Sequence, residues 1–118
     1  MTFIIHILKP SQKNLAPATA FIRQGGIVAF PTETVYGLGA DAFNRKAVKK
    51  IFAAKGRPSD NPLIVHIATY AQLSTIAVHI SKKARTLMKA FWPGPLTLIL
   101  YKKKTIPKEV TAGLDTVA

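Results

Sequence analysis

Short β-branched apolar runs alternate with segments of helical periodicity along this 118-residue chain. The alternation favours an α/β fold, because amphipathic helices cover the apolar residues that strands bury in a sheet. We therefore predict a twisted, largely buried mixed sheet with flanking helices. The predicted strands are 2–8, 27–30, 63–67 and 96–101, and the predicted helices are 14–24 (capped by Asn14), 44–55, 70–76 and 81–91.

The end of the chain bears on domain organisation. A chain of this length suits one domain, since most domains contain about 100–200 residues. Residues 115–118 have the pattern of a beginning strand, with no helix or polar tail after them. A sheet protein rarely stops at an unfinished edge. We therefore expect residues 1–118 to form a single domain that is truncated at its C-terminus.

Positive charge dominates the composition. The chain has 17 Lys and Arg residues against 5 Asp and Glu, a net charge of +12. Such an excess predicts attraction to anions: nucleic acid, nucleotides or anionic lipid. Fourteen of the 17 cations fall within 45–57, 82–89 and 102–108, and the last two groups are typical of solvated helix faces and a loop.

Cysteine is absent, which excludes a disulfide scaffold, a zinc–thiolate site and cysteine catalysis. No apolar run approaches the roughly 18 residues that a membrane span needs. We expect a cytoplasmic protein without a membrane partner.

The loop after the predicted strand 27–30 carries unusual chemistry. It reads Pro-Thr-Glu-Thr-Val-Tyr-Gly-Leu-Gly over 31–39, and loops at the carboxyl ends of strands in α/β sheets commonly bind ligands. The hydroxyls of Thr32 and Thr34 can donate to phosphate or carboxylate oxygens, and the glycines allow close backbone approach. The lack of a Gly-Lys-Ser/Thr ending excludes a P-loop. A plain structural turn is the alternative interpretation.

A second loop, 55–62, combines two cations with two prolines. Lys55 and Arg57 flank a glycine, and Pro58 and Pro62 restrict the loop. Arginine binds phosphate or carboxylate through two parallel hydrogen bonds, while lysine supplies a compact charge. We interpret 55–62 as a semi-rigid anion-binding loop, with a solvated basic loop as the alternative.

His66 interrupts the apolar run 63–67. The alternation of a strand puts it on the face opposite to Leu63, Val65 and Ile67, near the basic loop. A histidine in such a run is more often a satisfied core residue than a ligand-binding one. No two histidines stand near a carboxylate at metal-ligand spacing, and no Gly-x-Ser-x-Gly elbow occurs. We therefore predict no protein-held metal and no serine nucleophile.

Three longer motifs follow one another along the chain, and both their order and their spacing are informative. They are the 31–39 loop, Lys-x-Arg at 55–57 with Asn-Pro-Leu-Ile-Val-His at 61–66, and Trp-Pro-Gly-Pro-Leu-Thr at 92–97. Together they resemble the YrdC-like threonylcarbamoyl-AMP synthases, from about residue 12 to the end, which implies a YrdC/RibB-like fold. Family members are similar in forming threonylcarbamoyl-AMP and pyrophosphate from L-threonine, bicarbonate and ATP. A separate transferase complex then modifies the tRNA adenosine next to the anticodon.

The resemblance also implies roles for the motif residues. The catalytic cations, which would hold phosphate and carboxylate oxygens, are Lys55 and Arg57. The residues at the threonine and carbamate end are Thr32, Thr34, Tyr36 and His66. The further nucleotide-binding residues are Asn61 and Thr97. Mg²⁺ would arrive with the phosphates of ATP, which agrees with the lack of an acidic cluster.

One departure from the family pattern concerns the nucleotide. The family has a later Ser-x-Asn segment that contacts it, and this chain has no equivalent. We therefore expect the ATP side of the site to be incomplete in this chain, which would impair its activity.

A basic RNA-binding module without catalysis is the alternative function. The charge of +12 would suit phosphate contacts with tRNA or double-stranded RNA. However, the basic groups are not interleaved with aromatic residues expected to be exposed, and no RNA-binding signature occurs. A YrdC-like module of another carbamoyl-transfer system is a third interpretation, but those proteins carry cysteine motifs that this chain lacks.

Overall fold

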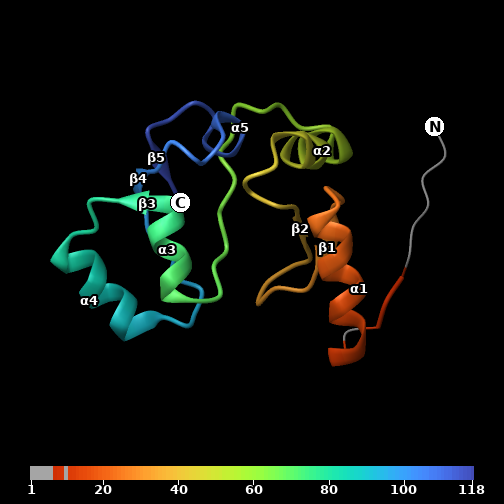
Figure 1. The fold of residues 1–118 in the computed structure, drawn as a ribbon, viewed down its shortest axis with the longest axis horizontal. Coiled ribbons are helices and arrows are strands. Elements are labelled where there is room, and N and C mark those ends of the chain that lie inside the picture. Colours follow the sequence, from red (N-terminus) through yellow and green to blue (C-terminus); the bar gives the residue numbers. More distant parts are fainter. Residues whose placement is uncertain (1–6, 10) are drawn as a thin grey trace.

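The structure is a computed structural model that describes residues 7–9 and 11–118. It combines helices with short strands, which confirms the predicted α/β class. Figure 1 shows two groups of elements with the connection 56–69 running between them. The first group contains α1 (Gln12–Arg23), β1 (Val28–Phe30), β2 (Gly37–Gly39) and α2 (Arg45–Lys55). The second contains α3 (Tyr70–Ile76), β3 (Ala77–Val78), α4 (Lys82–Phe91), β4 (Leu100–Lys102), α5 (Lys108–Thr111) and β5 (Thr116–Val117), with α5 against α2.

The strands of the described residues form two small antiparallel sheets. β1 pairs with β2, which puts Phe30 opposite Gly37. In the second sheet β4 lies between β3 and β5, and Tyr101 of β4 has Val78 and Thr116 as its two partners. β5 confirms that residues 115–118 include a strand.

Two strand predictions need correction, and a third is mostly untested. The run 63–67 is extended but forms no strand, because its N–H groups reach separate partners, Leu63 to the carbonyl of Val110 and Val65 to that of Ala118. Of the predicted strand 96–101 only its last two residues belong to β4. Most of the predicted strand 2–8 lies outside the described residues, and residues 7 and 8 are in no strand.

Local hydrogen bonds explain where α2 begins and ends. The side-chain oxygen of Asn44 accepts from the N–H groups of Lys46 and Ala47, both at 3.1 Å, as expected of an N-cap. Gly56 ends the helix in the left-handed region, with φ at +59°. The predicted helix 44–55 is therefore confirmed.

The start of α1 differs from the prediction. Ser11 is the residue at the N-cap, and Asn14 lies inside the helix. The side-chain amide of Asn14 donates to the carbonyl of Lys9 at 2.7 Å, so it acts as a donor to the preceding chain and caps nothing. None of the helices in the described ranges is long and apolar enough to cross a bilayer.

Two apolar clusters form the core. One joins α2, α3, α5 and β5, and the other joins α3, β3 and α4. Ile67 packs against both, and Leu63 and Val65 pack against the first, so the connection 56–69 ties the clusters together. The buried residues of the first cluster are Val48, Phe52, Ile76, Ile106, Val110 and Val117, and those of the second are Leu73, Ala77, Ala84 and Met88.

Candidate functional site

The first predicted loop spans the β1–β2 hairpin. Its shape depends on Thr32, whose hydroxyl oxygen accepts from the N–H groups of Thr34 at 3.3 Å and Val35 at 3.2 Å. The same hydroxyl donates to the carbonyl of Val35. These bonds hold the backbone in a Thr turn. Thr32 therefore fixes the conformation of the loop, whatever else it binds.

The other polar side chains of this loop face outward. The Thr34 hydroxyl lies 3.5 Å from that of Thr32, and Tyr36 is 73% exposed. Thr34 and Glu33 are exposed as well. The hairpin thus presents hydroxyl groups on a loop whose backbone is already ordered, which lowers the entropic cost of binding a ligand there.

The second predicted loop begins where α2 ends. Lys55 is the last residue of the helix, where a cation is favoured by the helix dipole. Gly56 turns the chain, and the N–H of Arg57 donates to the carbonyl of Phe52 at 3.1 Å. Lys55 is exposed and Arg57 is half-buried. Within residues 7–9 and 11–118 neither forms an ion pair, so both charges are available to an anion.

The segment after this loop places His66 on the surface. The backbone bonds of Leu63 and Val65 anchor the segment, and the odd-numbered residues 63, 65 and 67 are half-buried against the core. His66 points the other way and is exposed. The alternation predicted for 63–67 is confirmed, but the interpretation of His66 as a core histidine is wrong. Residues 64 and 66 face solvent, because no helix or strand among the described residues covers that side of the segment and buries the imidazole.

The third motif folds back on itself. The indole N–H of Trp92 donates to the carbonyl of Leu96 at 2.8 Å, and the ring of Tyr70 packs against the indole at 6.1 Å between centroids. A Cβ on Gly94 would lie 2.4 Å from the carbonyl oxygen of Phe91, so only glycine fits there. The motif therefore shapes a tight loop, and Thr97 follows it on the surface.

The structure brings some of the predicted residues together and leaves others apart. Thr32 and Thr34 are in contact, and His66 reaches the hairpin through the ring of Phe30, with centroids 5.8 Å apart. Lys55, Arg57 and Asn61 lie on the chain that leads into the His66 segment, while Thr97 belongs to the second group of elements. Which ligand each residue binds stays a prediction.

Phe30 is the residue that sequence reasoning missed. The sequence pattern shows Phe30 only as the last residue of the predicted strand 27–30. The available signal was the pair of glycines at 37 and 39, because a bulky side chain opposite glycines in a hairpin indicates a ring lying across the backbone.

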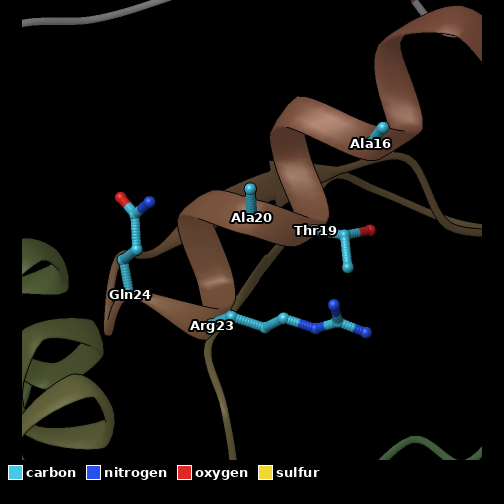
Figure 2. Close-up of a pocket in the computed structure, with 5 residues that line it drawn as sticks. All are labelled: Ala16, Thr19, Ala20, Arg23 and Gln24. Carbon is cyan, nitrogen blue, oxygen red and sulfur yellow. The ribbon is translucent and has the colours of Figure 1, made fainter.

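Two surface hollows lie away from these loops. Figure 2 shows the first, along one side of α1, lined by small side chains and by Arg23 and Gln24. The second lies on the β3–β4–β5 sheet, beside Tyr101 and Thr116. Neither of these two hollows is lined by a residue of the three motifs.

The family to which the chain belongs follows from comparisons with known proteins. The profile of the Sua5/YciO/YrdC family, described as "Telomere recombination", matches residues 20–118. The chain belongs to this family, as the three motifs predicted.

Two curated relatives carry the same name. The threonylcarbamoyl-AMP synthase of Pyrococcus abyssi is 56% identical over 100% of this chain and 35% of its own length. That of Bacillus subtilis is 59% identical over 94% of this chain and 32% of its own. The chain thus spans about a third of the length of these relatives.

Solved structures agree on the fold. P. abyssi Sua5 complexed with L-threonine superposes with a TM-score of 0.87 at 55% identity, over 93% of this chain and 32% of that one. Escherichia coli YciO superposes with a TM-score of 0.75 at 26% identity, over 92% and 53%. The YrdC-like fold is therefore confirmed.

Proposed function

We propose that this chain supplies the threonine-binding part of a threonylcarbamoyl-AMP synthase. The observation that carries the proposal is the superposition on a relative whose solved structure is a complex with L-threonine, at 55% identity over 93% of this chain. The ordered hydroxyl loop, the exposed His66, and Lys55 and Arg57, which form no ion pair within the described residues, agree with a site for a small zwitterion and for phosphates.

The proposed reaction has two steps. The amine of L-threonine attacks bicarbonate, water leaves, and a carbamate forms. A carbamate oxygen then attacks the α-phosphorus of ATP, and pyrophosphate leaves with the electrons of the broken P–O bond. Neither step needs a covalent protein intermediate, so catalysis rests on alignment and on stabilisation of phosphate charge. The threonylcarbamoyl group would then pass to a transferase that modifies tRNA.

In this proposal the motif residues divide the binding of the substrates among them. Lys55 and Arg57 would hold phosphate and carboxylate oxygens, and Asn61 and Thr97 would contact the nucleotide. Thr34, Tyr36 and His66 would bind threonine and the carbamate around the turn made by Thr32. The described part of the chain brings no three His, Asp or Glu side chains together, so we propose that Mg²⁺ arrives on ATP and neutralises its phosphates.

The test uses a chimaera in which this chain replaces the matching third of the P. abyssi enzyme. We expect pyrophosphate release that requires both L-threonine and bicarbonate. Arg57→Ala should lower kcat/KM about 10²–10³-fold, as for other groups that stabilise transition-state charge. Arg85→Ala, which removes the same charge from the exposed side of α4, should change it less than about twofold.

Two results would count against the proposal. A chimaera that releases no co-substrate-dependent pyrophosphate would overturn the assignment of function. If Arg57→Ala and Arg85→Ala lowered kcat/KM equally, the activity would depend on the net charge of the protein and not on an anion-binding role of the 55–62 loop.

A second candidate function, binding of RNA, is favoured by one observation. Residues 61–108 contain eight cations and no acidic residue, and the four on α4 are all exposed. A binder of this kind should lose affinity for double-stranded RNA steeply as salt rises, and should be indifferent to threonine. The titration of labelled RNA at two salt concentrations, with and without threonine, separates the two candidates.

A further inference from the structure

The ring of Phe30 lies across the glycine strand of the hairpin. Phe30 is opposite Gly37, and Gly39 is the diagonal neighbour on the same face of the pair. A Cβ on Gly37 would lie 3.2 Å from the ring, and one on Gly39 would lie 2.7 Å from it. The methyl group of Thr32 is 3.4 Å from the same position on Gly37. Phe30 and Thr32 therefore share one face, and the glycines leave the space that the ring occupies.

The same ring contacts His66 from a part of the chain that is anchored independently. The two rings meet edge to face, at 78° between planes. Backbone hydrogen bonds to residues 110 and 118 hold the His66 segment, and among the described residues no backbone hydrogen bond joins it to the hairpin. Because His66 is otherwise exposed, its contact with Phe30 limits the directions that the imidazole can take. Edge-to-face pairs prefer a defined geometry, so the contact orients the imidazole as well as holding it.

We propose that Phe30 is a positioning residue, which holds His66 beside the 31–36 loop so that the imidazole and the loop hydroxyls act on one ligand. The inference rests on the proposed function, because it assigns the ligand to be L-threonine. A second consequence concerns the glycines. A side chain at 37 or 39 would displace the ring of Phe30. Glycine at these two positions is therefore also needed to keep Phe30 against His66.

The first test measures the arrangement directly, by NMR on this chain. We expect nuclear Overhauser contacts between the ring protons of Phe30 and His66, and shifts of the imidazole protons by the phenyl ring current. Phe30→Leu keeps an apolar side chain and should abolish both, whereas Phe30→Tyr should keep them. Phe43→Leu, which removes another half-exposed ring (48% exposed), should leave the imidazole signals unchanged. Absence of the contacts in the native chain would overturn the proposal.

The second test is a double-mutant cycle on the chimaera. Phe30→Leu should raise the KM for threonine about 3–10-fold, the range of an aromatic pair contact, with a smaller effect on kcat. In a His66→Ala background the same change should have almost no further effect, because the group that it positions is gone. Phe30→Tyr should restore the native KM.

The outcomes separate the positioning role from a structural one and from the function itself. Additive effects of Phe30→Leu and His66→Ala on KM would show that Phe30 acts only on general stability, and would overturn the positioning role. A native chimaera without threonine-dependent activity would overturn the proposed function, and the NMR contacts would still decide whether Phe30 orients His66.

Discussion

Helices α1 and α2 have similar lengths and similar apolar periodicity, yet only α2 belongs to the core. α2 buries four residues, and α1 buries none of its 12. The difference lies in their neighbours: α5 and the 56–69 connection cover α2, whereas α1 packs chiefly beside β1. An apolar stripe allows one face of a helix to be buried, but the face is buried only where another element packs against it.

The N-terminus of α2 is also better stabilised than that of α1. Asn44 caps α2 through two amides, but the Ser11 side chain makes no capping bond to α1. The ammonium of Lys50 in α2 donates to the carbonyl of Gly25, in the turn that follows α1, at 2.6 Å. The 31–39 loop thus lies between a poorly covered element and a well-packed one.

The largest effect is expected from a matched pair of phenylalanine truncations. Phe52 of α2 is 6% exposed and Phe21 of α1 is 48% exposed. Phe52→Ala should lower the free energy of unfolding by about 3–5 kcal/mol, because it leaves a cavity. Phe21→Ala should cost about 1 kcal/mol. Urea unfolding followed by circular dichroism measures both, and equal losses would mean that α1 is as well packed in solution as α2.

A smaller effect is expected from the caps. Asn44→Ala should lower the free energy of unfolding by about 1 kcal/mol, since two amide donors lose their acceptor. Ser11→Ala should change it by less than about 0.5 kcal/mol, because no side-chain bond is lost. The shift in thermal midpoint compares the two variants. A larger loss of stability from Ser11→Ala than from Asn44→Ala would contradict the difference between the two caps.

The third prediction concerns acid. A hydrogen bond from its own backbone, and then the charges of Arg45, Lys49 and Lys108, lower the pKa of Glu109 below its ordinary value of 4.5, although burial opposes them. A lowered pKa stabilises the fold above the ordinary value, and this stability is lost as pH falls through the lowered one. We therefore expect the free energy of unfolding to decrease below about pH 4.5.

Glu109 connects α5 to the start of α2 through Arg45, with 3.2 Å between Nε and Oε2, so acid should loosen the well-packed region. Glu109→Gln should flatten the acid limb of a stability–pH curve. Arg45→Ala should flatten it less, since the backbone bond remains. A limb as steep in Glu109→Gln as in the native chain would rule out this carboxylate as the cause.

Local signals accounted for much of the fold. The cap at Asn44, the stop at Gly56 and the alternation at 63–67 depend on groups within a few residues of one another, and all three are confirmed. The start of α1 was mispredicted because Ser11 and Asn14 are both common N-cap residues. The strand predicted at 63–67 failed because a β-branched run indicates extended backbone but does not supply a pairing partner.

The sequence by itself determined the motif loops, the family and the cations that face solvent, since these depend on residue type and on local turn chemistry. Only the tertiary structure decided that His66 is exposed, that Phe30 joins it to the hairpin, and that α2 rather than α1 enters the core. Each of these depends on segments far apart in the chain. Periodicity shows which face of an element is apolar, and packing between distant segments decides whether that face is covered.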